Sequence, residues 1–157
     1  MENNNKKKRK ELQVSAIENG TVIDHVKFDS VMQVVKILDL QKIDDPVYIG
    51  SNLISKKYTK KGIIKVSNKF FEPDEINKIA LVSPTATLIE IRDYEITRKG
   101  KVEIPDKING IVKCVNPNCI TNVEDVSTKF TVIDKDDIKL RCHYCEKITA
   151  KRNMEFK

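Results

Sequence analysis

Apolar and polar residues alternate along two short segments near the start of the chain, which predicts a pair of β-strands. The first segment begins at Leu12, the second covers residues 21–27, and Asn19-Gly20 lies between them. Asn-Gly favours the left-handed backbone of a tight turn. We therefore predict a β-hairpin here.

Residues 28–40 place their apolar side chains at steps of three and four, which predicts a helix instead. The stripe consists of Phe28, Val31, Val34, Val35 and Leu38. Such a stripe is typical of a helix that covers one face of a sheet. Two further β-type segments, residues 46–54 and 62–66, follow on either side of a lysine-rich connection.

A second helix and a long strand complete this part of the chain. Residues 72–82 carry Pro73 at the expected first helical position and acidic side chains in the first turn, where the helix dipole favours them. Residues 85–98 are rich in β-forming side chains and predict one long strand. The order contains the β-α-β-β-α-β succession of a ferredoxin-like antiparallel sheet with two helices. We expect an α+β domain over residues 12–99.

The remaining residues differ in pattern from this domain. Residues 100–110 combine Pro105 with mixed charge, which predicts a linker. Beyond them come only short β-type segments interrupted by cysteines. The sequence therefore predicts a second, small all-β domain over residues 111–157.

Composition adds positive charge, much of it from one end of the chain. There are 29 Lys and Arg against 23 Asp and Glu, a formal net charge of +6. The run from Lys6 to Lys10 supplies part of this excess, and we interpret residues 1–11 as a disordered basic tail, with a phosphate-binding arm as the alternative. No segment approaches the roughly 20 apolar residues of a membrane helix or the apolar stretch of a secretory signal. We expect a cytoplasmic protein with no membrane partner.

All four cysteines lie in the predicted second domain, in two close pairs. Cys114 and Cys119 form one pair, and Cys142 and Cys145 form the other. Disulfides are rare in a reducing compartment, where paired cysteines usually bind metal. Four thiolates complete a tetrahedral zinc site and leave no open position for catalysis. We predict one structural zinc ion in a zinc-ribbon-like domain, with free thiols, disulfides or an iron-sulfur cluster as alternatives.

Two further features bear on this metal site. His143 lies between two predicted ligands and could replace Cys142, but we interpret it as an exposed neighbour because four thiolates are already present. A domain of about 50 residues has too small a core to be stable alone, so we expect metal loss to unfold it.

A lysine-bearing strand is the second candidate site. Lys61, Ile63 and Lys65 lie two residues apart, so they share one face of the predicted strand, with the lysines about 13 Å apart. That geometry suits a phosphate-bearing ligand with a flat base, although a solvated strand face is the plainer interpretation. Asp24-His25 is a polar pair at the end of an apolar segment. No glycine-rich phosphate loop and no catalytic nucleophile arrangement is visible.

Three sequence segments together resemble a known family. They are LQVSAIENGTVIDH at 12–25, CVNPNCIT at 114–121 and CHYCE at 142–146. The chain resembles the regulatory chain of aspartate carbamoyltransferase over nearly its whole length after the basic tail. The resemblance implies a chain that is not itself catalytic but binds CTP, ATP or UTP and allosterically controls pyrimidine biosynthesis. It also implies a regulatory dimer whose zinc domain contacts catalytic chains, in an assembly of two catalytic trimers and three regulatory dimers.

The resemblance implies roles for individual residues. It assigns zinc to Cys114, Cys119, Cys142 and Cys145. It places the base near the backbone of Ala16, Ile17 and Tyr94, with Ile91 and Ile96 nearby. It places the ribose against Asp24 and Lys65, and the phosphates near His25, Lys61 and Lys99. Val14 and Val22 line the same cleft, and Ile63 lies in the lysine stripe.

Two positions depart from the family pattern. Glu18 stands where a lysine often follows the Ala-Ile pair, and Ile89 stands where a polar amide often contacts the ligand. The alternative interpretation from another class is a zinc-ribbon protein that binds nucleic acid or the ribosome, suggested by the net charge and the cysteine pairs. Against it, the chain has no Trp, is 6% aromatic, and does not interleave aromatics with its basic residues. We expect no nucleic-acid partner.

Overall fold

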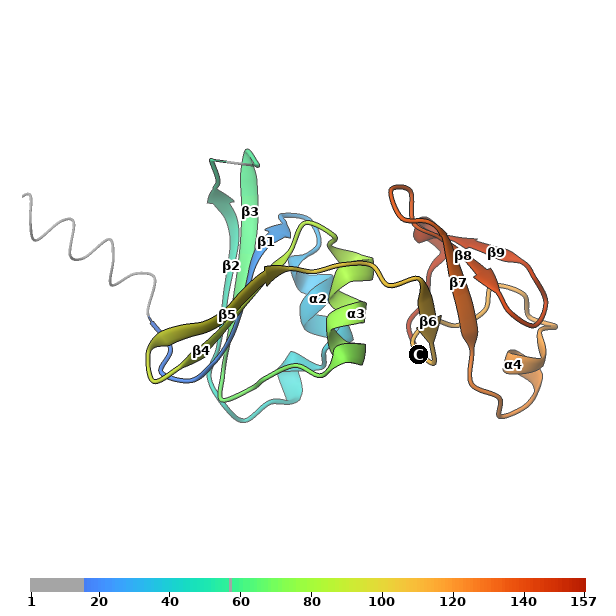
Figure 1. Ribbon diagram of the computed structural model, residues 1–157, viewed down its shortest axis with the longest axis horizontal. Coiled ribbons are helices and arrows are strands. Elements are labelled where there is room, and N and C mark those ends of the chain that lie inside the picture. The colour runs from blue at the N-terminus through green and yellow to red at the C-terminus, as the bar shows by residue number, and fades with distance from the viewer. Residues whose placement is uncertain (1–15, 57) are drawn as a thin grey trace, which may run out of the picture.

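In the described part of the chain, two antiparallel sheets follow one another (Figure 1). The structure is a computed structural model, and it describes residues 16–56 and 58–157. The predicted tail, the predicted strand segment at Leu12 and the candidate site residue Val14 lie outside these residues. Within the described part of the chain, no helix is both long and apolar enough to cross a membrane.

Over the residues that the structure describes, the first sheet has five strands in the order β2-β3-β1-β4-β5. Its elements are β1 (Gly20–Lys27), α2 (Val31–Ile37), the 3-10 helix η1 (Leu40–Lys42), β2 (Val47–Ile54), β3 (Lys60–Ser67), α3 (Pro73–Val82), β4 (Thr87–Arg92) and β5 (Glu95–Lys101). Every pair of neighbouring strands is antiparallel. This is the predicted β-α-β-β-α-β arrangement with one further strand at its edge, so the α+β prediction is confirmed.

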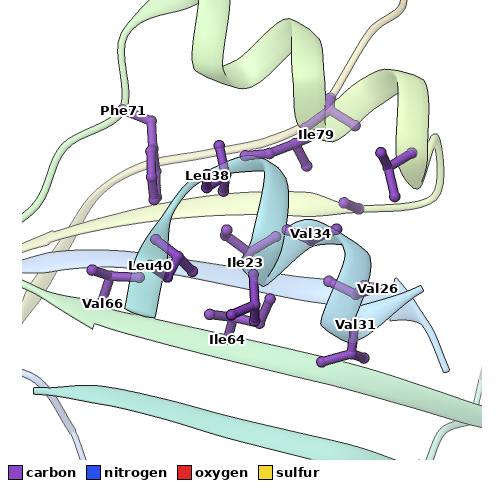
Figure 2. Close-up of a cluster of buried hydrophobic side chains, with 14 of the residues drawn as sticks. Ile23, Val26, Val31, Val34, Leu38, Leu40, Ile64, Val66, Phe71 and Ile79 are labelled. Carbon is purple, nitrogen blue, oxygen red and sulfur yellow. The ribbon is translucent and has the colours of Figure 1, made fainter. Parts of the chain in front are cut away.

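Both helices cover the same face of this sheet and enclose its core. Ile23 of β1 and Ile64 of β3 lie opposite each other in register and are fully buried. Val34 of α2 and Ile79 of α3 pack over them (Figure 2). Helix α3 begins at Pro73, as predicted, and the Glu75 carboxylate accepts a 3.1 Å hydrogen bond from the backbone N–H of Glu72. The predicted apolar stripe thus forms the core, except for Phe28, which is exposed and precedes α2.

The structure differs from the sequence predictions at the hairpin turn expected at Asn19-Gly20 and along the single strand expected over residues 85–98. Residues 16–19, just before Gly20, form no strand. They contact the turn between β4 and β5 instead, where the N–H of Tyr94 donates to the Glu18 carbonyl over 2.9 Å. The tight hairpin occurs instead at Asp93 and Tyr94, whose φ angles of 51° and 65° are both left-handed. This turn divides the single strand predicted at 85–98 into β4 and β5. Strand β5 continues to Lys101, inside the predicted linker.

The second sheet has four strands in the order β6-β7-β8-β9. Its strands are β6 (Lys107–Asn109), β7 (Lys129–Asp134), β8 (Lys139–Cys142) and β9 (Ile148–Ala150), accompanied by the single-turn α4 (Ile120–Val123) and the 3-10 helix η2 (Lys151–Asn153). Phe130, Ile138 and Leu140 are buried at its centre, together with three of the cysteines. The small all-β unit predicted after the first sheet is therefore present, but its first strand, β6, lies inside the segment predicted as a linker, residues 100–110.

The two cores meet at the end of α3. Ile79, Ala80 and Val82 belong to the first core, whereas Leu81 is buried in the second. Ile104 and Phe156 are partly buried against both cores. In Figure 1, α3 lies on the side of the first sheet that faces β6. Helix α3 thus contributes buried side chains to the cores of both units.

Candidate functional site

The four cysteine sulfurs gather at one point of the second unit. All four Sγ atoms lie within 4.8 Å of one another. The Cys114 and Cys145 sulfurs are 3.5 Å apart, and those of Cys119 and Cys142 are 3.8 Å apart. Tetrahedral zinc with bonds of about 2.3 Å places its sulfurs about 3.8 Å from one another. The cluster therefore fits zinc without rearrangement.

Two tight turns position these thiols. In the first turn, the Cys119 N–H donates to the Asn116 carbonyl over 3.0 Å, and the Asn122 amide donates to the carbonyls of Cys114 and Asn116. In the second turn, the Glu146 N–H donates to the Cys142 carbonyl over 3.0 Å, and Glu146 has a left-handed φ of 63°. Each cysteine pair is thus fixed by backbone bonds as well as by any shared ion.

Burial and hydrogen bonds shift the pKa values of three of the thiols, in different directions. It raises the pKa of Cys114 to about 12, and it also raises the pKa of Cys142. Burial acts in the same direction on Cys145, but hydrogen bonds from the Lys147 backbone and the Asn116 side chain outweigh it and lower the pKa of this thiol to about 7. A divalent cation supplies the charge that buried thiolates need. His143 is exposed and does not belong to the cluster.

The second candidate site lies on the face of the first sheet that the helices leave uncovered. Val22 of β1 is opposite Lys65 of β3 and Ile89 of β4, and Ile89 is opposite Lys99 of β5. Residues opposite each other share a face, and neighbours along a strand face opposite ways. Because Ile23 and Ile64 point into the core, these four side chains point away from the helices. We call this surface the open face.

One end of the open face carries an ion pair. The Lys61 ammonium donates a 2.7 Å hydrogen bond to the Asp24 carboxylate. Burial raises the pKa of Asp24, but this hydrogen bond and a second from the His25 backbone outweigh it, so the pKa lies below its usual value. Lys65 is 7% exposed, and burial lowers the pKa of its ammonium. The open face thus holds cationic groups in partly desolvated positions, where they interact strongly with an anion.

The other end of the open face lies at the β4–β5 turn. Ile91 is opposite both Gly20 and Ile96. From Gly20 to Asp24 the strand covers about 13 Å at 3.3 Å per residue. Ile17 is buried beside this end of β1, whereas Ala16 is exposed. The Tyr94 side chain is also exposed. The predicted base-contacting residues thus lie near the Gly20 end of β1, whereas Asp24, His25 and Lys61 lie near its other end. Lys99 lies between the two ends, at the level of Val22.

His25 lies in a β-bulge between Ile23 and Val26, and its backbone φ is 53°. Its Nδ1 is 3.2 Å from the Thr87 hydroxyl, and its ring lies edge-on to the Tyr58 ring, with 6.1 Å between centroids. A cleft of about 450 Å³ opens beside it, lined in part by Tyr58, Lys60 and Thr85. The sequence alone did not single out Tyr58, Thr85 or Thr87, because their approach to His25 depends on the pairing of β1 with β3 and with β4.

Comparison with known proteins decides the family. One family model, described as the aspartate carbamoyltransferase regulatory chain, allosteric domain, matches residues 12–103. A second, described as the metal binding domain of the same regulatory chain, matches residues 106–155. The chain belongs to the aspartate carbamoyltransferase regulatory chain family. It is a regulatory subunit, not a catalytic one, with an allosteric domain and a metal-binding domain.

Relatives agree over nearly the full length. A regulatory chain from Pyrococcus horikoshii is 53% identical over 139 residues, covering 87% of this chain and 91% of the relative. One from Thermococcus sibiricus is 51% identical over 148 residues, covering 94% and 97%. One from Parabacteroides distasonis is 47% identical over 150 residues, covering 96% and 97%. These similarities extend over both sheets.

Proposed function

We propose that the chain binds CTP, ATP or UTP on the open face and holds one zinc ion with its four cysteines. In this proposal the zinc domain docks onto catalytic chains of aspartate carbamoyltransferase, whose activity then responds to the bound nucleotide. The observation that carries it is the strand register, because it brings three lysines and four apolar side chains of the predicted site onto one uncovered face.

Each part of the open face suits one part of a nucleotide. The ammonium groups of Lys61 and Lys99 supply charge for phosphates, and His25 adds a ring nitrogen at the end of β1 where Lys61 meets Asp24. The Asp24 carboxylate is an acceptor for ribose hydroxyls, with Lys65 beside it. Val22, Ile91 and Ile96 offer apolar contact to the base, and Ile63 offers an apolar surface to the sugar at the level of Asp24. Ile89, which replaces an amide in this row, removes a hydrogen-bonding group and thus affects which base is preferred.

The zinc assignment rests on the sulfur geometry. Cys114, Cys119, Cys142 and Cys145 match the spacing of a tetrahedral thiolate site, and the Thr121 hydroxyl donates to the Cys119 sulfur over 3.2 Å. In the bound state the ion would neutralise the thiolates and hold both turns together. The ion would have a structural role, since four protein ligands leave no position for water.

The proposed assembly of two catalytic trimers with three regulatory dimers needs one contact surface for a catalytic chain and one for a second regulatory chain, and exposed apolar side chains are available for both. Val115, Ile120 and Val123 are 43%, 44% and 68% exposed next to the first cysteine turn, which is suited to docking on a catalytic chain. On the first sheet, the edge strand β2 exposes Tyr48, Ile49 and Ile54, which is suited to self-dimerisation.

Nucleotide binding controls activity only if affinity differs between the low- and high-activity forms of the assembly. Coupling energies of this kind are typically about 1–3 kcal/mol. CTP and ATP would compete for the same open face and act in opposite directions by favouring different forms.

Calorimetric titration of the zinc-loaded chain tests the nucleotide site. Lys65→Ala is expected to weaken CTP binding about tenfold or more, because it removes a charge-assisted contact. Lys36→Ala is the matched control, since this lysine is exposed on α2, on the opposite side of the sheet. Equal CTP affinity in Lys65→Ala and the wild type would contradict the proposed site.

A mixing experiment tests the assembly. The zinc-loaded chain and a catalytic trimer of aspartate carbamoyltransferase are combined, and the product is sized by light scattering. A larger species whose activity responds to CTP or ATP is expected, and only when zinc is present. A mixture that stays unassociated would contradict the proposed partner.

A further inference from the structure

Two hydroxyl groups connect the β1 bulge to the end of α3. The Thr85 hydroxyl donates to the His25 carbonyl over 2.8 Å. The Ser83 and Thr85 oxygens are 3.3 Å apart, and the Lys27 N–H donates to the Ser83 oxygen over 3.0 Å. Because Thr85 already donates its proton to His25, Ser83 is the donor to Thr85. The direction of every bond is therefore determined, from Lys27 through Ser83 and Thr85 to His25.

This relay begins and ends on β1 and passes through the end of α3. Ser83 is fully buried, and its N–H closes the last turn of the helix by donating to the Ile79 carbonyl over 2.8 Å. Consecutive hydrogen bonds polarise one another, and a buried group that loses its partner is costly. The bulge and the helix end are thus held in one arrangement.

The same helix end reaches the metal-binding unit. Leu81 lies two residues before Ser83 and packs with Ile108, Ile111 and Val112 in the second core. Val112 in turn lies two residues before Cys114. A shift of the bulge is therefore connected, through one hydrogen-bonded turn and one buried side chain, to the segment that enters the cysteine cluster.

We infer that Ser83 and Thr85 are positioning residues that hold Asp24 for the ribose and His25 for the phosphates of the nucleotide, and that they link binding at this end of the open face to Leu81 in the metal-binding core. The inference rests on the proposed function, since it concerns the phosphate end of the open face. Ser83 is the decisive residue. It is completely shielded, so its hydroxyl cannot contact a ligand and can affect binding only through its bonded neighbours, Lys27 and Thr85.

The test measures CTP affinity by calorimetry and amide hydrogen exchange at residues 79–83, both on the zinc-loaded full chain. Ser83→Ala is expected to weaken CTP binding about three- to tenfold, the effect of one hydrogen bond. It is also expected to abolish the change in exchange that CTP produces at residues 79–83 in the wild type. Thr85→Val is expected to act likewise, and Thr85→Ser, which keeps the hydroxyl, to restore both.

Thr21→Val is the matched control. Thr21, on β1, is buried like Ser83, and its hydroxyl donates over 2.6 Å to the carbonyl of Lys69, a residue outside α3. A purely structural role for Ser83 would make both variants less stable without changing the response to CTP.

The possible failures are distinguishable. If the wild type binds CTP and Ser83→Ala matches it in affinity and exchange, the inference is overturned and the proposed function stands. If the wild type binds neither CTP nor ATP, the proposed function fails, and the inference fails with it. Circular dichroism of each variant establishes that it is folded before either result is scored.

Discussion

The ammonium of Lys61 on β3 donates a hydrogen bond of 2.7 Å to the carboxylate of Asp24 on β1, at one end of the open face. Their side chains are only 21% and 17% exposed, so the two charges are largely shielded from water. The pair fixes Lys61 over the bulge before any ligand arrives. A phosphate that binds there must share this ammonium with Asp24.

Asp24→Asn is expected to lower the free energy of unfolding by about 1–3 kcal/mol at neutral pH, because it leaves a shielded ammonium without its counter-charge. The pKa of Asp24 is depressed in the folded chain. Its contribution is therefore present above the ordinary carboxyl pKa of about 3.9, and it is lost as the pH falls through the lower folded value. Urea unfolding from pH 7 to pH 3 should show the difference between variant and wild type shrinking only below about pH 4.

Glu90→Gln is the control for this prediction. Glu90 pairs with Arg98 at 3.9 Å, but Arg98 is 73% exposed, so removing the charge is expected to change stability by less than about 1 kcal/mol. Equal losses of unfolding free energy in Asp24→Asn and Glu90→Gln would show that shielding from water does not strengthen the Asp24–Lys61 pair.

Removal of zinc is expected to unfold the second sheet while the first keeps its own core. Cys119→Ser should abolish stoichiometric zinc binding, because a tetrahedral site then lacks one thiolate. Colorimetric zinc release and circular dichroism measure both effects. His143→Ala should keep one zinc per chain, since this imidazole is outside the cluster. Loss of zinc in His143→Ala would revise the ligand set.

Gly62→Ala is expected to destabilise the chain by about 1–3 kcal/mol through overpacking. A Cβ at this position would lie 2.0 Å from Cγ2 of Val31, which is buried in the core. Gly100 on β5 is the matched control, because a Cβ there meets nothing within 4 Å. Chemical denaturation should show Gly100→Ala within about 0.5 kcal/mol of the wild type. A neutral Gly62→Ala would mean that α2 is able to move away from β3.

The double change Asp93→Asn with Tyr94→Gly is expected to raise the free energy of unfolding by about 0.5–1 kcal/mol. Both positions have left-handed φ, and Asn-Gly adopts this turn with less strain. Nucleotide affinity should not change if only the backbone at position 94 contacts the base, and calorimetry with CTP checks this. A fall in stability would show that the Tyr94 side chain makes a compensating contact.

Much of the first sheet was predictable because its elements have strong local signals. The apolar steps of α2, the proline and acidic residues at the start of α3 and the alternation of β3 each correspond to an observed element. The positions of the turns were less predictable. Asn19-Gly20 has the composition of a hairpin turn, yet the Asn19 side chain accepts a hydrogen bond from the Asp93 N–H over 3.1 Å. A contact 74 residues apart cannot be derived from local composition.

The candidate sites differ in the same way. Cysteine spacing alone was enough to predict that four thiols would meet. The lysine stripe predicted a shared face for Lys61 and Lys65, but the neighbours Lys99 and Ile89 depend on the pairing of β1, β4 and β5. The Ser83 and Thr85 hydroxyls carried no sequence signal, because their partners are backbone groups on a distant strand.

The position of Leu81 has a practical consequence for experiments on isolated domains. A fragment that ends near residue 103 would keep the first core but present Leu81 to solvent, next to the buried end of α3. The oligomeric fraction of such a fragment should rise with its concentration. A Leu81→Lys substitution should keep the fragment monomeric. Cutting the chain between its two sheets therefore leaves one apolar side chain of α3 without the core that covers it.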